Sequence, residues 1–243
     1  LLSIIPRDRR KTYNMKKVID LICDTGSFFE ISPFYGKSRI TGFARFNGFS
    51  AGIIANNPLF LGGSTDVTGG SKVNRFLQVC DIFNIPVVML ADEPGFLVGL
   101  ESEKQGIERA GARLMSTVCL SKMPIFTVVI SKVYGVAGQC SHRPTGMFKR
   151  VCWPSSNWGS MHISGGVTAA YKSEIGQSDN PEAKKIEIEN RLKNITSPFR
   201  TAETTGQNII DPRETRRHIC LFLEQSQRVL KRQVGKSRFL FLP

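Results

Sequence analysis

The sequence predicts an α/β domain in which helices cover a parallel sheet. Two short segments, 86–91 and 125–130, consist almost wholly of apolar residues and have the length of buried strands. Between them, residues 102–120 repeat apolar side chains at helical spacing. A strand, a helix and a second strand in this order are typical of parallel strands joined by a crossover helix, because such strands are buried on both faces.

Two helices are expected in the first third of the chain. Residues 14–23 form a short helix that Asn14 caps, and Thr25-Gly26 ends it. Residues 71–83 form a longer one, in which the apolar side chains recur every three or four positions and therefore share one face.

A hairpin lies between these helices. Residues 40–46 and 49–55 flank Asn47-Gly48, the dipeptide that type I′ turns prefer because both residues tolerate positive φ. The two segments are therefore expected to pair as antiparallel strands.

Two further helices are expected near the end of the chain. Residues 181–193 form an amphipathic surface helix. The last helix has Asp211 as its N-cap, Pro212 at its first position and Glu214 at its third. No linker or internal repeat divides the sequence, which predicts a single domain over 1–243 with a C-terminal helix and basic tail over 212–243.

Composition limits the functional classes. Apolar residues make up 41% of the chain and charged residues 22%, without an apolar run long enough for a membrane span, so a soluble globular protein is expected. The net charge of +13 raises nucleic acid as a partner, but the basic residues gather at the two ends of the chain and are more typical of solvated surface. Nucleic-acid binding is therefore the weakest interpretation.

The six cysteines are scattered and contain no C-x-x-C pair, which argues against a zinc site; no metal is expected. Several fall on apolar helix faces, as buried thiols do in an intracellular protein.

A turn of small residues, Gly135-Val136-Ala137-Gly138, follows the second apolar strand. No bulky side chain covers the main chain there, so N–H groups at a helix start can bind a negative oxygen, as in an oxyanion hole. The alternative is a packing turn that lets a helix approach the sheet closely. The residues by themselves leave both interpretations open.

Side-chain catalysis is weakly indicated. Asp92 and Glu93 are adjacent on an extended segment and point to opposite sides, so at most one can face a site. His142 and His162 follow small-residue turns without a carboxylate partner at motif spacing, and His218 is expected at the surface. Nucleophile-elbow and Walker motifs are absent from the sequence.

Motifs along nearly the whole chain resemble the carboxyltransferase subunits of biotin-dependent acyl-CoA carboxylases of the propionyl-CoA, methylcrotonyl-CoA and acetyl-CoA type. They are Ile4-Ile5-Pro6 with Tyr13-Asn14-Met15, Asn56-Asn57-Pro58, Asp66 with Lys72, Arg75, Phe76 and Cys80-Asp81, Pro94-Gly95-Phe96-Leu97-Val98-Gly99 with Glu103, Gly106 and Gly111-Ala112, Lys132-Val133-Tyr134-Gly135, Trp153-Pro154, and 210–216.

The resemblance implies a crotonase-like (ClpP-like) ββα-superhelix and the C-terminal carboxyltransferase domain of a two-domain subunit, with 1–13 as a remnant of the interdomain linker. That domain supplies the biotin side of the active site, and the N-terminal domain of the same or a neighbouring subunit supplies the acyl-CoA side. Biotin would arrive as carboxybiotin on a separate carrier domain, with the biotin carboxylase on another chain or domain. A homo- or hetero-oligomer in the cytoplasm or in a mitochondrial or plastid matrix, with no membrane association, is implied.

The resemblance also implies site residues and a reaction. The N–H groups of Val136 and Ala137 would hold the ureido oxygen of biotin. Carboxybiotin would release carbon dioxide, the biotin nitrogen left behind would remove the α-proton of the acyl-CoA, and the resulting enolate would attack the carbon dioxide. The residues that would line the cofactor site are Gly95, Phe96, Gly135, Gly138, Gly165 and Gly166.

Three positions depart from the family pattern. Relatives usually have a small residue near Val136 and glycine at the place of His162, and His142-Arg143-Pro144 interrupts a small, helical stretch. These changes are expected to crowd the biotin site. An acyl-CoA decarboxylase that uses the same backbone groups, or an inactive assembly subunit, therefore remains an alternative.

Overall fold

The computed structural model describes residues 1–8, 11–142, 146–160 and 163–235. Its strands are β1 (Phe29–Ile31), β2 (Arg39–Phe46), β3 (Phe49–Asn56), β4 (Val87–Glu93), β5 (Ile125–Tyr134), β6 (Phe148–Cys152), β7 (Asn157–Gly159) and β8 (Asn208–Ile209). Its helices are α1 (Met15–Ile22), α2 (Val67–Ile82), α3 (Leu100–Lys104), α4 (Ile107–Leu120), α5 (Gly135–Gln139), α6 (Ile163–Ala170), α7 (Lys172–Gly176), α8 (Pro181–Ile195), α9 (Pro198–Thr205) and α10 (Thr215–Gln233), with 3-10 turns at Leu61–Gly63 and Pro212–Glu214.

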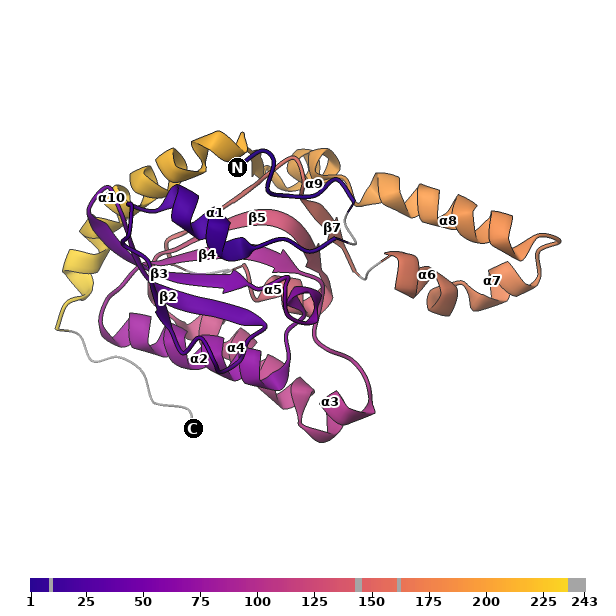
Figure 1. Cartoon of the computed structure of the whole chain (residues 1–243), viewed down its shortest axis with the longest axis horizontal. Coiled ribbons are helices and arrows are strands. Elements are labelled where there is room, and N and C mark those ends of the chain that lie inside the picture. Colours follow the sequence, from indigo (N-terminus) through magenta and orange to yellow (C-terminus); the bar gives the residue numbers. More distant parts are fainter. Residues whose placement is uncertain (9–10, 143–145, 161–162, 236–243) are drawn as a thin grey trace.

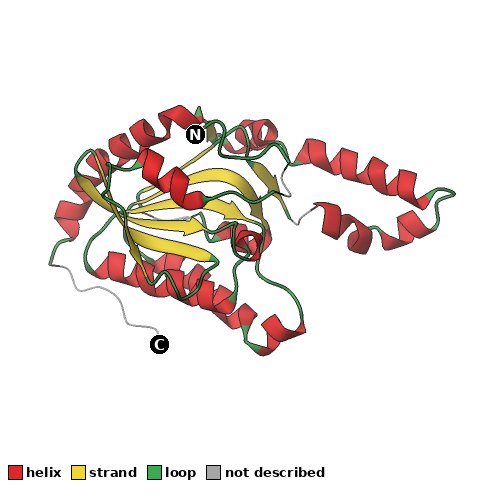
Figure 2. Cartoon of the chain, in the orientation of Figure 1, coloured by secondary structure: helices red, strands yellow, loops and turns green. Residues whose placement is uncertain are grey.

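One mixed sheet forms the centre of the molecule (Figures 1 and 2). Its strands run in the order β1-β2-β3-β4-β5-β6-β8, and β7 pairs with the end of β5. The pairs β1·β2 and β2·β3 are antiparallel, whereas β3·β4, β4·β5, β5·β6, β5·β7 and β6·β8 are parallel. The predicted α/β class is confirmed, and the strands from β3 to β8 make up the parallel part of the sheet.

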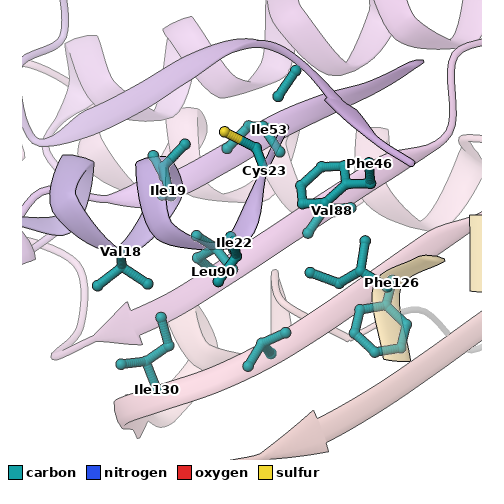
Figure 3. Packing of buried hydrophobic residues seen from close by; sticks show 14 of the residues in the cluster. Val18, Ile19, Ile22, Cys23, Phe46, Ile53, Val88, Leu90, Phe126 and Ile130 are labelled. Atoms are coloured by element: carbon teal, nitrogen blue, oxygen red, sulfur yellow. The ribbon is translucent and has the colours of Figure 1, made fainter. Parts of the chain in front are cut away.

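Helices cover both faces of the sheet. α1 and α10 lie over one face and α2 and α4 over the other, while α6, α7 and α8 extend from the body as an arm (Figure 1). On the first face, Val18, Ile19 and Ile22 of α1 pack on the apolar side chains of β3, β4 and β5 (Figure 3). Burial of this apolar area is the main force that holds the layers together.

The chain before α1 belongs to this layer as well. Leu1, Ile4 and Ile5 pack against the same cluster, and Tyr13 is buried within it.

In the described part of the chain, no helix combines the length and apolar character that crossing a membrane requires.

The local predictions hold where a short motif decides the structure. The side chain of Asn14 accepts a hydrogen bond from the N–H of Lys16 and caps α1. Asn47 and Gly48 have φ values of 51° and 80°, as a type I′ turn requires. The side chain of Asp211 accepts from the N–H of Arg213, as predicted, although the first three residues form a 3-10 turn before α10 begins.

Three predicted boundaries are wrong. α2 begins at Val67 rather than at residue 71, because the carboxylate of Asp66 caps it by accepting from the N–H of Gly69. The predicted helix 102–120 is two helices, since Gly106 at φ 82° breaks the backbone between α3 and α4. β5 continues to Tyr134, four residues further than predicted, because β7 pairs with its end.

None of the six cysteines, all of which lie in the described part of the chain, forms a disulfide bond. Cys23, Cys80, Cys140 and Cys152 are buried, Cys119 is exposed and Cys220 is half-buried. Burial raises the pKa of the Cys140 thiol to about 12, so this group stays protonated at neutral pH. The predicted burial is confirmed for these four cysteines.

Candidate active site

The candidate site lies where β4 and β5 end side by side. The two strands are parallel, with Leu90 opposite Val128 and Glu93 opposite Val133. The turn 94–99 follows β4, and α5 follows β5 directly. Ligands of α/β sheets commonly bind at the carboxyl ends of adjacent strands.

α5 begins on a glycine that the backbone requires. Gly135 has a φ of 58°, and a Cβ there would stand 3.0 Å from the carbonyl oxygen of Ser160. Val136 and Ala137 are the second and third residues of the helix. N–H groups in the first turn of a helix have no acceptor within the helix. Among the described residues, no acceptor is found for either N–H group.

An open groove runs beside this helix start. Its volume is about 430 Å³, and its described lining residues are Phe96, Leu97, Val98, Glu103, Ile107, Glu108, Gly111, Ala112, Met115 and Val136. Val136 is 60% exposed and lines the groove, whereas Ala137 is buried and is not among the described lining residues. The groove therefore joins the turn after β4, the face of α4 and the start of α5.

Gly111 lets the ring of Phe96 lie against α4. A Cβ at this position would stand 2.9 Å from the ring's Cζ, which is closer than side chains pack. The ring consequently forms a wall of the groove instead of being displaced into it.

A buried polar network holds the turn that carries Phe96. The Glu93 carboxylate accepts hydrogen bonds from the guanidinium of Arg39, from Thr65 Oγ1 at 2.8 Å and from Asn56 Nδ2 at 3.2 Å, and its other oxygen accepts from the N–H of Gly95 at 3.1 Å. Arg39 and Glu93 are both almost fully buried. The network fixes the position of the first residues of the turn. It also occupies the N–H of Gly95, which donates to Glu93 and whose φ is 135°.

The comparisons with known proteins decide the family. The carboxyl transferase domain family matches residues 1–238 of the chain. This chain belongs to that family. The methylmalonyl-CoA carboxyltransferase 12S subunit of Propionibacterium freudenreichii subsp. shermanii is 37% identical over 229 residues, which are 92% of this chain and 43% of the relative. The mitochondrial propionyl-CoA carboxylase beta chain of Homo sapiens is 35% identical over 91% of this chain and 40% of its own length.

Solved structures agree with this assignment. The crystal structure of transcarboxylase 12S with methylmalonyl-coenzyme A and methylmalonic acid bound, described as a hexamer assembly, superposes with a TM-score of 0.85 at 33% identity, over 100% of this chain and 46% of that one. The beta subunit of geranyl-CoA carboxylase from P. aeruginosa shares the fold, with a TM-score of 0.83 at 22% identity over 93% of this chain and 44% of that one. The predicted crotonase-like fold class is confirmed, and the chain spans less than half the length of these relatives.

The groove of this carboxyl transferase domain unites only part of the predicted set. Phe96 and Val136 line it together, and Gly135 and Ala137 adjoin Val136 in the chain. The described lining of the groove does not include Gly95, Gly138 or Gly166. Gly165 and Gly166 lie in α6, on the arm (Figure 1).

Gly138 has a packing role, which gives a test of how α5 is held. A Cβ on Gly138 would stand 2.6 Å from Cγ1 of Val133 and 3.3 Å from its carbonyl carbon. Because Val133 is β-branched and cannot turn away easily, G138A is expected to lower the free energy of unfolding by about 1–3 kcal/mol in urea denaturation. The double variant V133A/G138A should recover part of this loss. Equal stability of G138A and the wild type would show that α5 does not need this close contact.

Asp92 and Glu93 point to opposite sides, as predicted. Asp92 accepts from Tyr13 Oη at 3.0 Å and from the N–H of Lys132 at 2.9 Å, with Lys132 Nζ 3.5 Å away, while Glu93 faces Arg39. Burial, followed by the charge of Asp92, raises the pKa of Tyr13 well above its ordinary value, so its hydroxyl remains a donor. Both carboxylates are structural groups beneath the site.

The histidines are not part of the described groove lining. His142 packs edge-on against Phe148, with 5.0 Å between the ring centroids, and burial lowers its pKa. His218 is half-buried on α10 rather than fully exposed. His162, Arg143-Pro144 and the basic tail beyond residue 235 lie outside the described residues.

Sequence reasoning missed Arg39 and Thr65. Arg39 begins β2, 54 residues before Glu93, and Thr65 lies just ahead of α2. The available signal was a basic residue directly before the predicted strand 40–46, and the local sequence does not indicate which residue pairs with it.

Proposed function

We propose that this chain is the biotin-side half of a carboxyltransferase that moves a carboxyl group from carboxybiotin to the α-carbon of an acyl-CoA. The observation that carries the proposal is the pair of N–H groups of Val136 and Ala137, which open α5 beside an accessible groove and have no described acceptor. The relatives support it, since they are named as carboxyltransferases and as carboxylase beta chains.

The groove suits the ring system of biotin. Its lining is mainly apolar, as an uncharged bicyclic ring requires, and the helix start presents donors that match a single ureido oxygen. Phe96 and Val136 would contact the ring from two sides. The side chain of Val136 would narrow the space that is left for the ring. The charged exceptions in the lining are Glu103, which lies on α3, and Glu108, which lies at the start of α4.

The residues of the chain would act through the backbone. When bound, carboxybiotin supplies the carboxyl group that is transferred. The N–H groups of Val136 and Ala137 would stabilise the negative charge that develops on the ureido oxygen, and each such donor contributes about 3 to 4 kcal/mol in an oxyanion hole. Glu93 would keep the turn before Phe96 in place, and the apolar groove would exclude water from the reacting groups.

The partners that we propose agree with the length of the relatives, of which this chain covers less than half. The acyl-CoA side would come from an N-terminal carboxyltransferase domain in the same or a neighbouring subunit, and biotin carrier and biotin carboxylase units would supply the carboxyl donor. The whole would form an oligomer, as transcarboxylase 12S does in its hexamer. We place it in the cytoplasm or in an organelle matrix.

The complete enzyme that contains this chain is the material for the test. With an acyl-CoA, ATP, magnesium and labelled bicarbonate, it is expected to incorporate label into an acid-stable product, and avidin should block the incorporation by trapping biotin. No incorporation with acetyl-, propionyl- or methylcrotonyl-CoA, and no saturable binding of a biotinylated carrier, would favour an inactive assembly subunit.

Decarboxylation is the second candidate. Two relatives, from Propionigenium modestum and Veillonella parvula, are methylmalonyl-CoA decarboxylase alpha subunits, at 34% and 35% identity. A decarboxylase would use the same N–H groups but begin from a carboxylated CoA ester. Carboxyl transfer from methylmalonyl-CoA to biotin without ATP, together with no fixation of bicarbonate, would assign the chain to this class.

A further inference from the structure

A second groove lies away from the candidate active site, between the β1–β2 edge of the sheet and α2. Its volume is about 580 Å³, within the range of small-molecule sites. Ile31, Phe43, Phe76 and Val79 provide its apolar surface, and Phe43 and Phe76 contact each other with 5.1 Å between ring centroids.

The rim of this groove is basic. Lys72, Arg75 and Arg113 line it, and none of its described lining residues is acidic. Arg75 and Arg113 are exposed and form no ion pair with another described residue. The charge of Glu30 acts on Lys72, but Glu30 pairs with Lys16 at 2.6 Å, and the charge of Lys16 acts on Lys72 in the opposite direction. The groove therefore carries positive charge without an acidic residue in its described lining.

Lys72 is held in place although its charge is buried. It is 5% exposed, and its ammonium group donates to the carbonyl oxygen of Arg39 at 2.8 Å. An ammonium group has three N–H donors, so this bond leaves two for other acceptors. An anion in the groove would satisfy them and offset the cost of burying the charge.

Gln78 gives an independent indication of a ligand. Its side chain lines the groove and is only 3% exposed, yet its Nε2 has no hydrogen-bond partner among the described residues. Asn74 lies one turn earlier on α2, and its Oδ1 accepts from Thr117 Oγ1, which leaves the amide nitrogen available. A buried amide without a partner costs free energy, which an acceptor on a ligand would recover.

We propose that this groove binds a phosphorylated nucleoside. The guanidinium groups of Arg75 and Arg113 suit the planar, two-point recognition of a phosphate, and Lys72 adds a point charge. The apolar surface of Phe43, Phe76 and Val79 accommodates the base, and Asn74 and Gln78 donate hydrogen bonds to it. The proposal does not depend on carboxyl transfer, since the two grooves share no described lining residue.

Calorimetric titration of the full chain with ADP tests the charges. Saturable binding is expected, with affinity about tenfold lower in R75Q and in R113Q, because each change removes charge-assisted hydrogen bonds. R109Q is the matched control, since Arg109 is an exposed arginine one turn away on α4 and does not line the groove in the described structure. Adenosine and inorganic pyrophosphate should each bind more weakly than ADP.

Competition with coenzyme A separates two sources of the same chemistry. Displacement of ADP by coenzyme A in the wild type, with the same loss in R75Q, identifies the nucleoside phosphate of that cofactor as a ligand; no displacement identifies a free nucleotide. Binding that does not saturate, or that weakens equally in R109Q and R75Q, reflects the net charge alone and overturns the proposal.

Q78L separates a ligand role from a structural role. Because Nε2 has no protein partner, the variant should melt at the same temperature as the wild type or higher, while its affinity for ADP falls several-fold. Unchanged ADP affinity in Q78L contradicts the proposal, whatever its melting temperature.

Discussion

Replacing Arg39 by methionine is expected to lower the free energy of unfolding by about 3–5 kcal/mol. Arg39 and Glu93 form an ion pair in which both side chains are almost fully buried, and Thr65 and Asn56 complete the hydrogen bonds to the carboxylate. Removing the guanidinium leaves a negative charge in the interior without its counter-charge, which costs more than the pair itself contributes. Urea denaturation monitored by circular dichroism measures the loss.

Two controls identify the cause. R45Q changes an exposed arginine on the same strand and should shift stability by less than about 0.5 kcal/mol. The double variant R39M/E93Q removes the unpaired charge and should recover much of the loss, as coupled residues do in a double-mutant cycle. Additive losses in the double variant would mean that the two side chains stabilise the fold separately.

The fold could be predicted where adjacent residues decide it. The hairpin follows from Asn47-Gly48, and the central strands follow from runs of apolar residues that both faces of the sheet bury. β7 and β8 span only three and two residues, too few to show any periodicity. β6 mixes Lys149 and Arg150 with apolar residues, because one of its ends is only partly buried.

The first turn of α2 could not be predicted because of its amino-acid composition. Gly69 and Gly70 have low helix propensity, so the first turn does not look helical. The structure shows why one of them is needed: a Cβ on Gly69 would stand 2.0 Å from Ser38 Oγ. That contact joins residues distant in sequence and cannot be inferred from a local pattern.

The backbone of the candidate site could be predicted from the sequence, but the side-chain contacts that hold it in place could not. The small residues at 135–138 indicate a strand followed closely by a helix start, and the structure has β5 and α5 there. The wall formed by Phe96 depends on Gly111, and the turn before it depends on Arg39; both contacts span more than ten residues. The sequence alone also leaves open whether Val136 is buried, and in the structure it faces the groove.

Replacing Val136 by proline is expected to reduce the rate of carboxyl transfer about 10²- to 10³-fold. Proline lacks the N–H group that we assign to the oxyanion hole, and this loss is typical of removing one such donor. Proline is tolerated in the first turn of a helix, where the missing N–H breaks no helical hydrogen bond. V136A is the matched control, since it shortens the side chain and keeps the donor.

The initial rate of label transfer from carboxybiotin to acyl-CoA, measured for V136P and V136A in the complete enzyme, tests the proposed role of α5 most directly. Circular dichroism and urea denaturation of both variants establish that they fold alike. The proposal predicts a rate in V136A within a few-fold of the wild type and a loss of at least a hundredfold in V136P. Equal rates in the two variants would contradict it and leave the small-residue turn at 135–138 as a packing contact between β5 and α5.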